Sequence, residues 1–307
     1  MKPLISIVIP TYKRPIFLTK VINCILRQSY KNYEIIVVDD DPDSTLYNRL
    51  DWLKQNKKIK YIKHTRNRGA SAARNTGIKN SIGEYIALLD DDDLWLPQKL
   101  EKQVSRFIDL SPKVGVVYCG YYKVYNEQII HEEFPILKGK IYKYSLKKCP
   151  IGSPTPLIKR ECFEKVGLFD ERLPSCQDWD LWIRIAKFYD FDFVPEILAV
   201  HCCHGAQISV DLNKKIVGRE MILKKYEKEL TKYPDIFSWH LRRLGSLYCL
   251  KGDIKKSRKY FLTSLKANPF NIGSWIHIAL SYISVSFHRA VIKKYGLIKI
   301  NDFFIIN

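Results

Sequence analysis

The stretch Glu84-Tyr-Ile-Ala-Leu-Leu-Asp-Asp-Asp-Asp93 places four carboxylates directly behind a short apolar run. An apolar run of this length that ends in polar residues is typical of a strand buried in a sheet. In open α/β sheets, ligands bind beyond the carboxyl ends of the strands. Because carboxylate oxygens are the ligands that Mg²⁺ and Mn²⁺ prefer, the four acids predict a divalent-cation site.

Two other interpretations of the acidic run are a solvated loop and a calcium loop of the helix-loop-helix kind. The calcium loop needs Gly at its sixth position and Glu at its twelfth. Counted from Asp90, these positions hold Trp95 and Glu101, so the required Gly is missing. The solvated loop stays open as the alternative, although the apolar Leu94-Trp-Leu96 that follows must pack nearby.

The first 120 residues alternate between strand and helix patterns. Apolar runs predict buried strands at residues 4–9, 34–38, 59–64, 85–89 and 114–118. Apolar residues recurring at intervals of three and four predict helices at residues 15–29, 70–78 and 96–108, and a further helix with Leu46, Leu50 and Leu53 on one face. Such alternation predicts a doubly wound, mostly parallel sheet.

Several segments follow the predicted strands and should meet at one edge of this sheet. They are Pro10-Thr-Tyr12, Asp39-Asp-Asp41, Arg66-Asn-Arg-Gly69 and the acids from Asp90 to Asp93. An aromatic ring, carboxylates and arginines in one pocket fit a nucleoside diphosphate bound through a divalent cation. No G-x-G-x-x-G or Walker pattern is present, which argues against a dinucleotide cofactor or a P-loop.

Composition indicates one large domain with an appendage, since the chain has 307 residues, 46% of them hydrophobic. The net charge is +19, and residues 201–307 carry +12 of it. Such a region suits nucleic acid or anionic lipid headgroups, but ordinary solvated lysines explain it equally well. We expect no nucleic-acid partner, because no nucleic-acid motif is present. Neither a signal peptide nor a span of ~20 apolar residues is evident, so we expect a cytoplasmic protein.

Several motifs in a fixed order resemble family 2 glycosyltransferases of the GT-A fold. They are Ser6-Ile-Val-Ile-Pro-Thr-Tyr12, Val37-Val-Asp-Asp40, Arg66-Asn-Arg-Gly69 with Ala73-Arg-Asn-Thr-Gly77, Leu89-Asp-Asp-Asp-Asp93, Val166-Gly-Leu-Phe-Asp170 and Gln177-Asp-Trp-Asp-Leu-Trp-Ile-Arg184. The resemblance covers residues 1 to about 210. It implies a GT-A domain, Rossmann-like and doubly wound, at residues 1–212, followed by an all-α extension at residues 213–307.

The resemblance also implies roles for individual residues. Those implied to bind the nucleotide are Pro10, Thr11, Tyr12, Arg14, Asp40, Arg68 and Asp91. Those implied to bind Mn²⁺ or Mg²⁺ are Asp92, Asp90 and His204, although a lone His is more often structural. The implied catalytic base is Asp178, and Gln177 and Trp179 are the implied acceptor contacts.

Asp178 is the second residue of a pair that reads Glu-Asp in the family and Gln177-Asp178 in this chain. A neighbouring Glu would raise the pKa of Asp178 by repulsion, whereas Gln can only form hydrogen bonds. Asp178 is also compatible with a simple role as an acid at a helix N-terminus. Trp179 fits packing as well as acceptor stacking.

The implied function is an inverting, metal-dependent glycosyltransferase. It would move a sugar from a nucleotide-diphosphate sugar, with UDP expected, to a glycan or lipid-linked acceptor in cell-surface polysaccharide synthesis. The alternative is a catalytically weakened nucleotide-sugar binding module whose helical tail recruits a protein partner.

The C-terminal third resembles a single tetratricopeptide helical hairpin at about residues 236–270. One repeat cannot bury its own apolar face, so it must dock on the first domain, continue into the next helix or meet a partner. We expect that next helix to run from Ile272 to Lys294, with aromatic and basic residues. Two roles stay open for it: contact with the inner face of the cell membrane, or a plain cap.

Overall fold

The computed structural model describes residues 2–46, 55–204 and 211–295. Leu50 and Leu53 of the helix predicted before the third strand lie outside the described residues. The chain divides into two compact units. The first, here the N-terminal unit, comprises Met1–Glu171 and Gln177–His204, and the second, the C-terminal unit, comprises Arg172–Cys176 and Gly205–Asn307.

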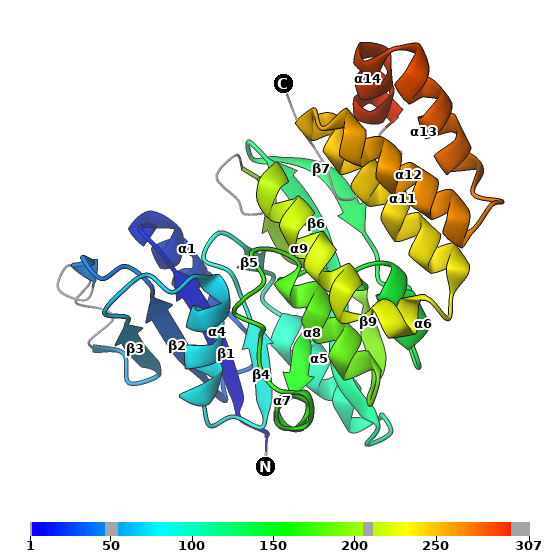
Figure 1. The fold of residues 1–307 in the computed structure, drawn as a ribbon. Helices are drawn as coiled ribbons and strands as arrows, with labels where there is room; N and C mark the ends of the chain where they lie inside the picture. The colour runs from blue at the N-terminus through cyan, green and yellow to red at the C-terminus, as the bar shows by residue number, and fades with distance from the viewer. Residues whose placement is uncertain (1, 47–54, 205–210, 296–307) are drawn as a thin grey trace. The chain divides into compact units, whose positions relative to one another are not determined.

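The N-terminal unit is built on one sheet, in which the described strands number nine (Figure 1). They are β1 (Ile5–Thr11), β2 (Tyr33–Asp39), β3 (Ile59–Lys63), β4 (Tyr85–Leu88), β5 (Leu94–Trp95), β6 (Val114–Tyr125), β7 (Gln128–Glu133), β8 (Leu157–Lys159) and β9 (Asp190–Cys202). Their order is β3-β2-β1-β4-β8-β6-β9-β5, and β7 pairs with β6. The helices of this unit are α1 (Pro15–Leu26), α4 (Ala70–Lys79), α5 (Lys99–Ile108), α6 (Tyr142–Lys147), α7 (Arg160–Val166) and α8 (Gln177–Ala186).

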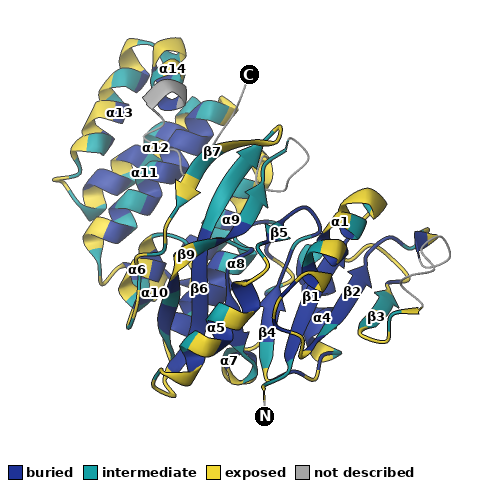
Figure 2. Ribbon diagram, turned by 180° about the vertical axis from the view of Figure 1, so that it is seen from behind, coloured by how far each residue is buried: buried dark blue, intermediate teal, exposed yellow. Residues whose placement is uncertain are grey.

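The predicted doubly wound, mostly parallel sheet is confirmed. Strand β1 pairs in parallel with β2 and β4, β2 with β3, and β6 with β9. Strand β8 runs antiparallel between β4 and β6, so the sheet is mixed. All residues of β1 are buried, as expected for a strand covered by helices on both faces (Figure 2).

Alternate residues of β1 enter separate cores on the two faces of the sheet. Ile5, Ile7 and Ile9 share one core with apolar residues of α1 and α5. Val8 points into the other core, which contains apolar residues of α4, α7 and α8. Helix α4 lies very close to β1, since a Cβ at Gly77 would be 2.3 Å from Val8 Cγ1. A Cβ at this position would have to displace the Val8 side chain.

The C-terminal unit is helical in its described part. Its helices are α9 (Leu212–Lys225), α10 (Glu227–Leu230), α11 (Pro234–Lys251), α12 (Ile254–Ala267), α13 (Ile272–Ile283) and α14 (Val285–Tyr295). Helix α11 ends at Gly252, whose φ of +101° allows the chain to turn into α12. Gly245 lets the two helices approach, because a Cβ there would be 2.6 Å from the Phe261 ring. Within the described residues, none of the helices combines the length and the apolar character needed to span a bilayer.

The single helix expected from Ile272 to Lys294 is wrong, because the structure has two helices there. Helix α13 ends at Ser284, whose backbone is extended, with φ −160° and ψ 121°. The Ser284 hydroxyl accepts a hydrogen bond from the Phe287 N–H at 3.3 Å. A serine side chain that bonds nearby backbone in this way favours a helix start over a helix interior.

Candidate active site

The loops that follow β1 and β4 are joined by hydrogen bonds between their polar side chains. Thr11 Oγ1 donates to Asp91 Oδ2 at 2.8 Å. Arg14 Nη1 lies 3.0 Å from Asp91 Oδ1 and 2.7 Å from Asp92 Oδ2. Since β1 and β4 are parallel neighbours, their carboxyl ends bring these residues together, as the sequence predicted for this edge of the sheet.

Asp92 also contacts the segment that follows β9. His204 Nε2 lies 2.8 Å from Asp92 Oδ2, the same oxygen that Arg14 contacts. The His204 ring stacks on Phe17, with ring centroids 6.0 Å apart. The structure therefore brings together a carboxylate and an imidazole that are 112 residues apart in the sequence.

Asp90 points to a different cation, Arg74 on α4. Arg74 Nη2 donates to Asp90 Oδ1 at 2.5 Å, and the guanidinium lies 5.5 Å from the centroid of the Phe169 ring. Burial lowers the pKa of Arg74, but the charges of Asp90 and Asp178 more than compensate and raise it. Arg74 is therefore a permanently charged, buried cation beside two acids.

Asp178 is the second residue of α8 and is half-buried. Burial raises the pKa of Asp178 above its ordinary value, Arg74 opposes the shift, and Asp90 adds to it. The next residue, Trp179, is buried, and its Nε1 donates to the Ser145 carbonyl at 2.6 Å. These contacts place the Trp179 ring in the interior of the unit.

Asp40 follows β2 and holds the loop that leads into α4. Its Oδ1 accepts the Arg68 N–H at 2.8 Å and lies 2.7 Å from His64 Nδ1. Its Oδ2 accepts the Gly69 N–H at 2.7 Å, and Gly69 has a φ of +86° where α4 begins. Oδ1 therefore has two partners and Oδ2 has one, so a single acceptor site, on Oδ2, is left for a ligand, and the residue is only 3% exposed.

The other residues predicted to bind nucleotide lie around this loop and the end of β1. Pro10 is a residue of β1 itself and pairs with Val38 of β2. The Tyr12 side chain is 43% exposed, with Lys13 Nζ 5.3 Å from its ring centroid. The Arg68 side chain is also exposed and lies 3.5 Å from Glu171.

The sequence prediction assigned no role to Arg74 or His201. Arg74 stands in the quoted motif Ala73-Arg-Asn-Thr-Gly77, which was a signal for it. His201 Nδ1 lies 3.0 Å from Oδ1 of the fully buried Asp93, which also accepts the Cys202 N–H at 3.0 Å. Asp93 therefore ties the acidic run to β9.

The predicted metal ligands suit a cation that takes only a few of its ligands from the protein. In residues 2–46, 55–204 and 211–295, no group of three or more His, Cys, Asp or Glu side chains is arranged to hold a metal ion. Asp92 and His204 are in contact, but Asp90 is paired with Arg74. One carboxylate and one imidazole suit a divalent ion whose other ligands are substrate phosphates and water.

The mixed sheet and the acids beyond its fourth strand define the GT-A class of nucleotide-sugar transferase fold. Residues 6–167 match the family described as "Glycosyl transferase family 2", and the chain belongs to that family. The protein is therefore a glycosyltransferase.

Two relatives illustrate this membership. An uncharacterized glycosyltransferase of Rickettsia typhi is 34% identical over 96% of this chain and 93% of its own length. WfgD of Escherichia coli is 33% identical over 60% of this chain and 70% of its own length. Its name describes a UDP-Glc:α-D-GlcNAc-diphosphoundecaprenol β-1,3-glucosyltransferase.

Two solved structures share the fold. S. aureus TarS 1-349, in complex with UDP-GlcNAc, superposes with a TM-score of 0.68 at 16% identity, covering 100% of this chain and 95% of TarS 1-349. The mannosyltransferase PcManGT from Pyrobaculum calidifontis, in complex with GDP-Man and Mn²⁺, gives 0.55 at 17% identity, covering 97% and 82%. At such identities the likeness shows the fold alone.

Proposed function

We propose that this glycosyltransferase uses a UDP-sugar and a divalent metal, and that it inverts the configuration at the anomeric carbon. One observation carries the proposal. Arg74 is hydrogen-bonded to Asp90 of the acidic run, and its pKa is raised by the charges of both Asp90 and Asp178, the latter at the start of α8. The predicted metal-binding run and the predicted base therefore belong to one cluster of charges.

The donor nucleotide would bind at the ends of β1 and β2. Tyr12 has an exposed ring on which a base can stack. Asp40 accepts the Arg68 N–H, and its own N–H donates to the carbonyl of Thr11, the residue before Tyr12, at 2.9 Å. Asp91, held by Thr11 and Arg14, would meet the ribose. UDP is supported as the nucleotide by the name of WfgD and by the ligand in the TarS structure.

Asp92 and His204 would hold Mn²⁺ or Mg²⁺, with Asp90 close by. When bound, the cation neutralises the charge that builds on the leaving diphosphate. Support comes from the contact between Asp92 and His204 and from the Mn²⁺ in the related mannosyltransferase structure. Arg14, which contacts both Asp91 and Asp92, would add a fixed positive charge on the same side.

Asp178 would act as the general base. The acceptor oxygen attacks the anomeric carbon, its proton passes to the Asp178 carboxylate, and the bond from that carbon to the diphosphate oxygen breaks. One displacement of this kind inverts the configuration. The raised pKa of Asp178 makes it a better proton acceptor than an ordinary aspartate. Gln177 would contact the acceptor, whereas the buried Trp179 fits packing better.

The acceptor would be a glycan or a lipid-linked sugar in cell-surface polysaccharide synthesis. The support is the lipid diphosphate acceptor in the name of WfgD. Such an acceptor would require the enzyme to work at the inner face of the cell membrane.

A donor screen tests the proposal by measuring nucleotide release from UDP- and GDP-sugars with lipid-linked GlcNAc as acceptor. We expect turnover with a UDP-sugar that needs Mn²⁺ or Mg²⁺ and is lost in Asp178→Asn and Asp92→Ala. Asp178→Asn should still bind UDP with metal, which separates chemistry from binding. Metal-dependent UDP binding without turnover across the whole screen would instead indicate a binding module.

A further inference from the structure

Helix α13 exposes a face made only of apolar side chains, which we call the apolar face. Its members are half exposed or more, and they lie three, four or seven residues apart, on one side of the helix: Ile272, Trp275, Ile276, Tyr282 and Ile283. Figure 2 shows the exposed colour along this helix. No charged residue occurs between Ile272 and Ile283.

The opposite face of α13 is polar and buried. Ser274, His277 and Ser281 lie at most 1% exposed within the C-terminal unit. His277 stacks on Phe261 of α12, with ring centroids 4.7 Å apart and ring planes 6° apart. These contacts fix the rotation of the helix, so the apolar face cannot turn inward. A surface helix of a soluble protein normally has the reverse arrangement.

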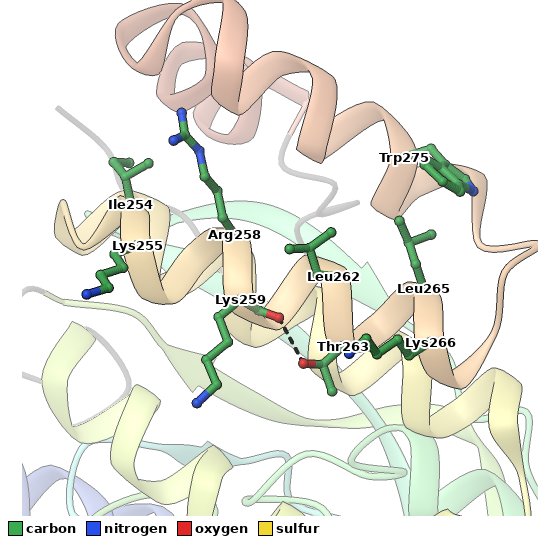
Figure 3. Close-up of a pocket in the computed structure, with 9 residues that line it drawn as sticks. All are labelled: Ile254, Lys255, Arg258, Lys259, Leu262, Thr263, Leu265, Lys266 and Trp275. Atoms are coloured by element: carbon green, nitrogen blue, oxygen red, sulfur yellow. Dashed lines mark hydrogen bonds between the residues drawn. The ribbon is translucent and has the colours of Figure 1, made fainter.

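A groove of about 810 Å³ runs along α12 and reaches Trp275 of this face (Figure 3). Its lining combines apolar side chains with cations: Ile254, Lys255, Arg258, Lys259, Leu262, Thr263, Leu265, Lys266 and Trp275. Among the residues that the structure describes, none of the acidic ones lines this groove. Lysine stems can lie along apolar surface while their ammonium groups reach outward.

The charge of this segment is entirely positive. From Ile254 to Tyr295 the sequence contains no Asp or Glu and eight basic residues, namely Lys255, Lys256, Arg258, Lys259, Lys266, Arg289, Lys293 and Lys294. A symmetric contact with a second copy would bring these like charges together at a cost. An apolar, aromatic face flanked by lysines matches a helix that lies in the headgroup region of an anionic bilayer.

We propose that the apolar face of α13 and the lysines of α12 bind the surface of a bilayer that contains anionic phospholipid. This surface goes beyond the proposed reaction and does not depend on it, because membrane binding needs neither donor nor metal. Burial of Trp275 and its neighbours would supply apolar free energy, and Lys255 and Lys259 would supply attraction to lipid phosphates.

Vesicle co-sedimentation of the full chain tests this surface. We expect binding to vesicles of phosphatidylcholine with phosphatidylglycerol, and binding weaker by about tenfold or more to pure phosphatidylcholine. The double variants Trp275→Ser/Ile276→Ser and Lys255→Gln/Lys259→Gln should each weaken binding by about tenfold. Ile108→Ser and Lys79→Gln/Lys113→Gln, which alter exposed residues of the N-terminal unit, are the matched controls and should bind normally.

Nucleotide release with a soluble acceptor should be unchanged in all these variants, which separates this proposal from the proposed reaction. The proposal is overturned if the wild-type chain does not bind vesicles that contain anionic lipid. It is also overturned if the control variants lose as much binding as the variants of α12 and α13. It is also overturned if sedimentation velocity without lipid shows an oligomer that Trp275→Ser/Ile276→Ser dissociates. In that case the apolar face joins two copies of the chain.

Discussion

Arg74 Nη2 and Asp90 Oδ1 are 2.5 Å apart, in an ion pair whose cation is only 8% exposed. The same guanidinium is close enough to Asp178 to oppose the rise in that residue's pKa. Because taking a charge out of water is costly, a buried arginine needs acids beside it. Arg74 therefore couples the acidic run after β4 to the start of α8.

Replacement of Arg74 should harm both stability and activity. Arg74→Ala leaves Asp90 and Asp178 without their cation, which we expect to cost about 3 kcal/mol of unfolding free energy. Urea denaturation and nucleotide release measure the two effects. The control for stability is Arg68→Ala, whose exposed ion pair with Glu171 should be worth less than about 1 kcal/mol. Equal losses of unfolding free energy in the two variants would contradict the structural role of Arg74.

The pH dependence of turnover should report the raised pKa of Asp178. A general base must be ionised, so kcat/KM should fall as pH decreases through this pKa. Since burial raises the pKa of Asp178, the fall should occur above the ordinary aspartate value of about 3.9. Arg74→Lys keeps the positive charge but changes its position. The acidic limb of its pH profile should therefore shift relative to that of the wild-type protein at the same salt concentration. A profile that is flat down to about pH 4 would contradict the assignment.

The fold of the first half could be predicted because each signal was local. Strands β1, β2 and β4 are continuous apolar runs, and their parallel order follows from the helices between them. Strand β8 was missed because three residues, Leu157–Lys159, show no period. Strand β9 was missed because Pro195 and several register shifts interrupt its pattern.

At the candidate active site and in the C-terminal unit, the sequence predicted some features and not others. The meeting of Thr11 with Asp91 follows from neighbouring parallel strands. The pairing of Arg74 with Asp90 could not be predicted in this way, because an arginine in a helix pattern normally indicates a solvated face. In α13 the periodicity was visible, but it did not reveal that the polar face of the helix is the buried one.

Acid should destabilise the C-terminal unit through His277. Burial, with His288 nearby, lowers the pKa of His277 from about 6.5 to about 3. Between those values the unfolded chain binds a proton that the folded chain excludes, so stability is full above about pH 6.5 and falls as pH drops. Thermal unfolding between pH 7 and pH 4 should show this slope, and His277→Phe, which keeps a ring against Phe261, should reduce it. An unchanged slope in His277→Phe would assign the acid sensitivity to other groups.

Metal removal should weaken nucleotide binding through two particular side chains. Asp92 Oδ2 contacts both the His204 ring and the Arg14 guanidinium, so the two side chains act at the same carboxylate oxygen. We expect EDTA to lower UDP affinity, with Mn²⁺ restoring it, because the diphosphate otherwise faces the acids without a bridging cation.

In calorimetric titrations, Asp92→Ala should abolish the Mn²⁺ effect, and His204→Ala should reduce it about tenfold or more. Tyr30→Phe is a distant control, since it removes only a bond to the Pro3 carbonyl and should titrate like the wild type. UDP affinity that is equal with EDTA and with Mn²⁺, and unaffected by Asp92→Ala, would show that arginines alone neutralise the diphosphate in this enzyme.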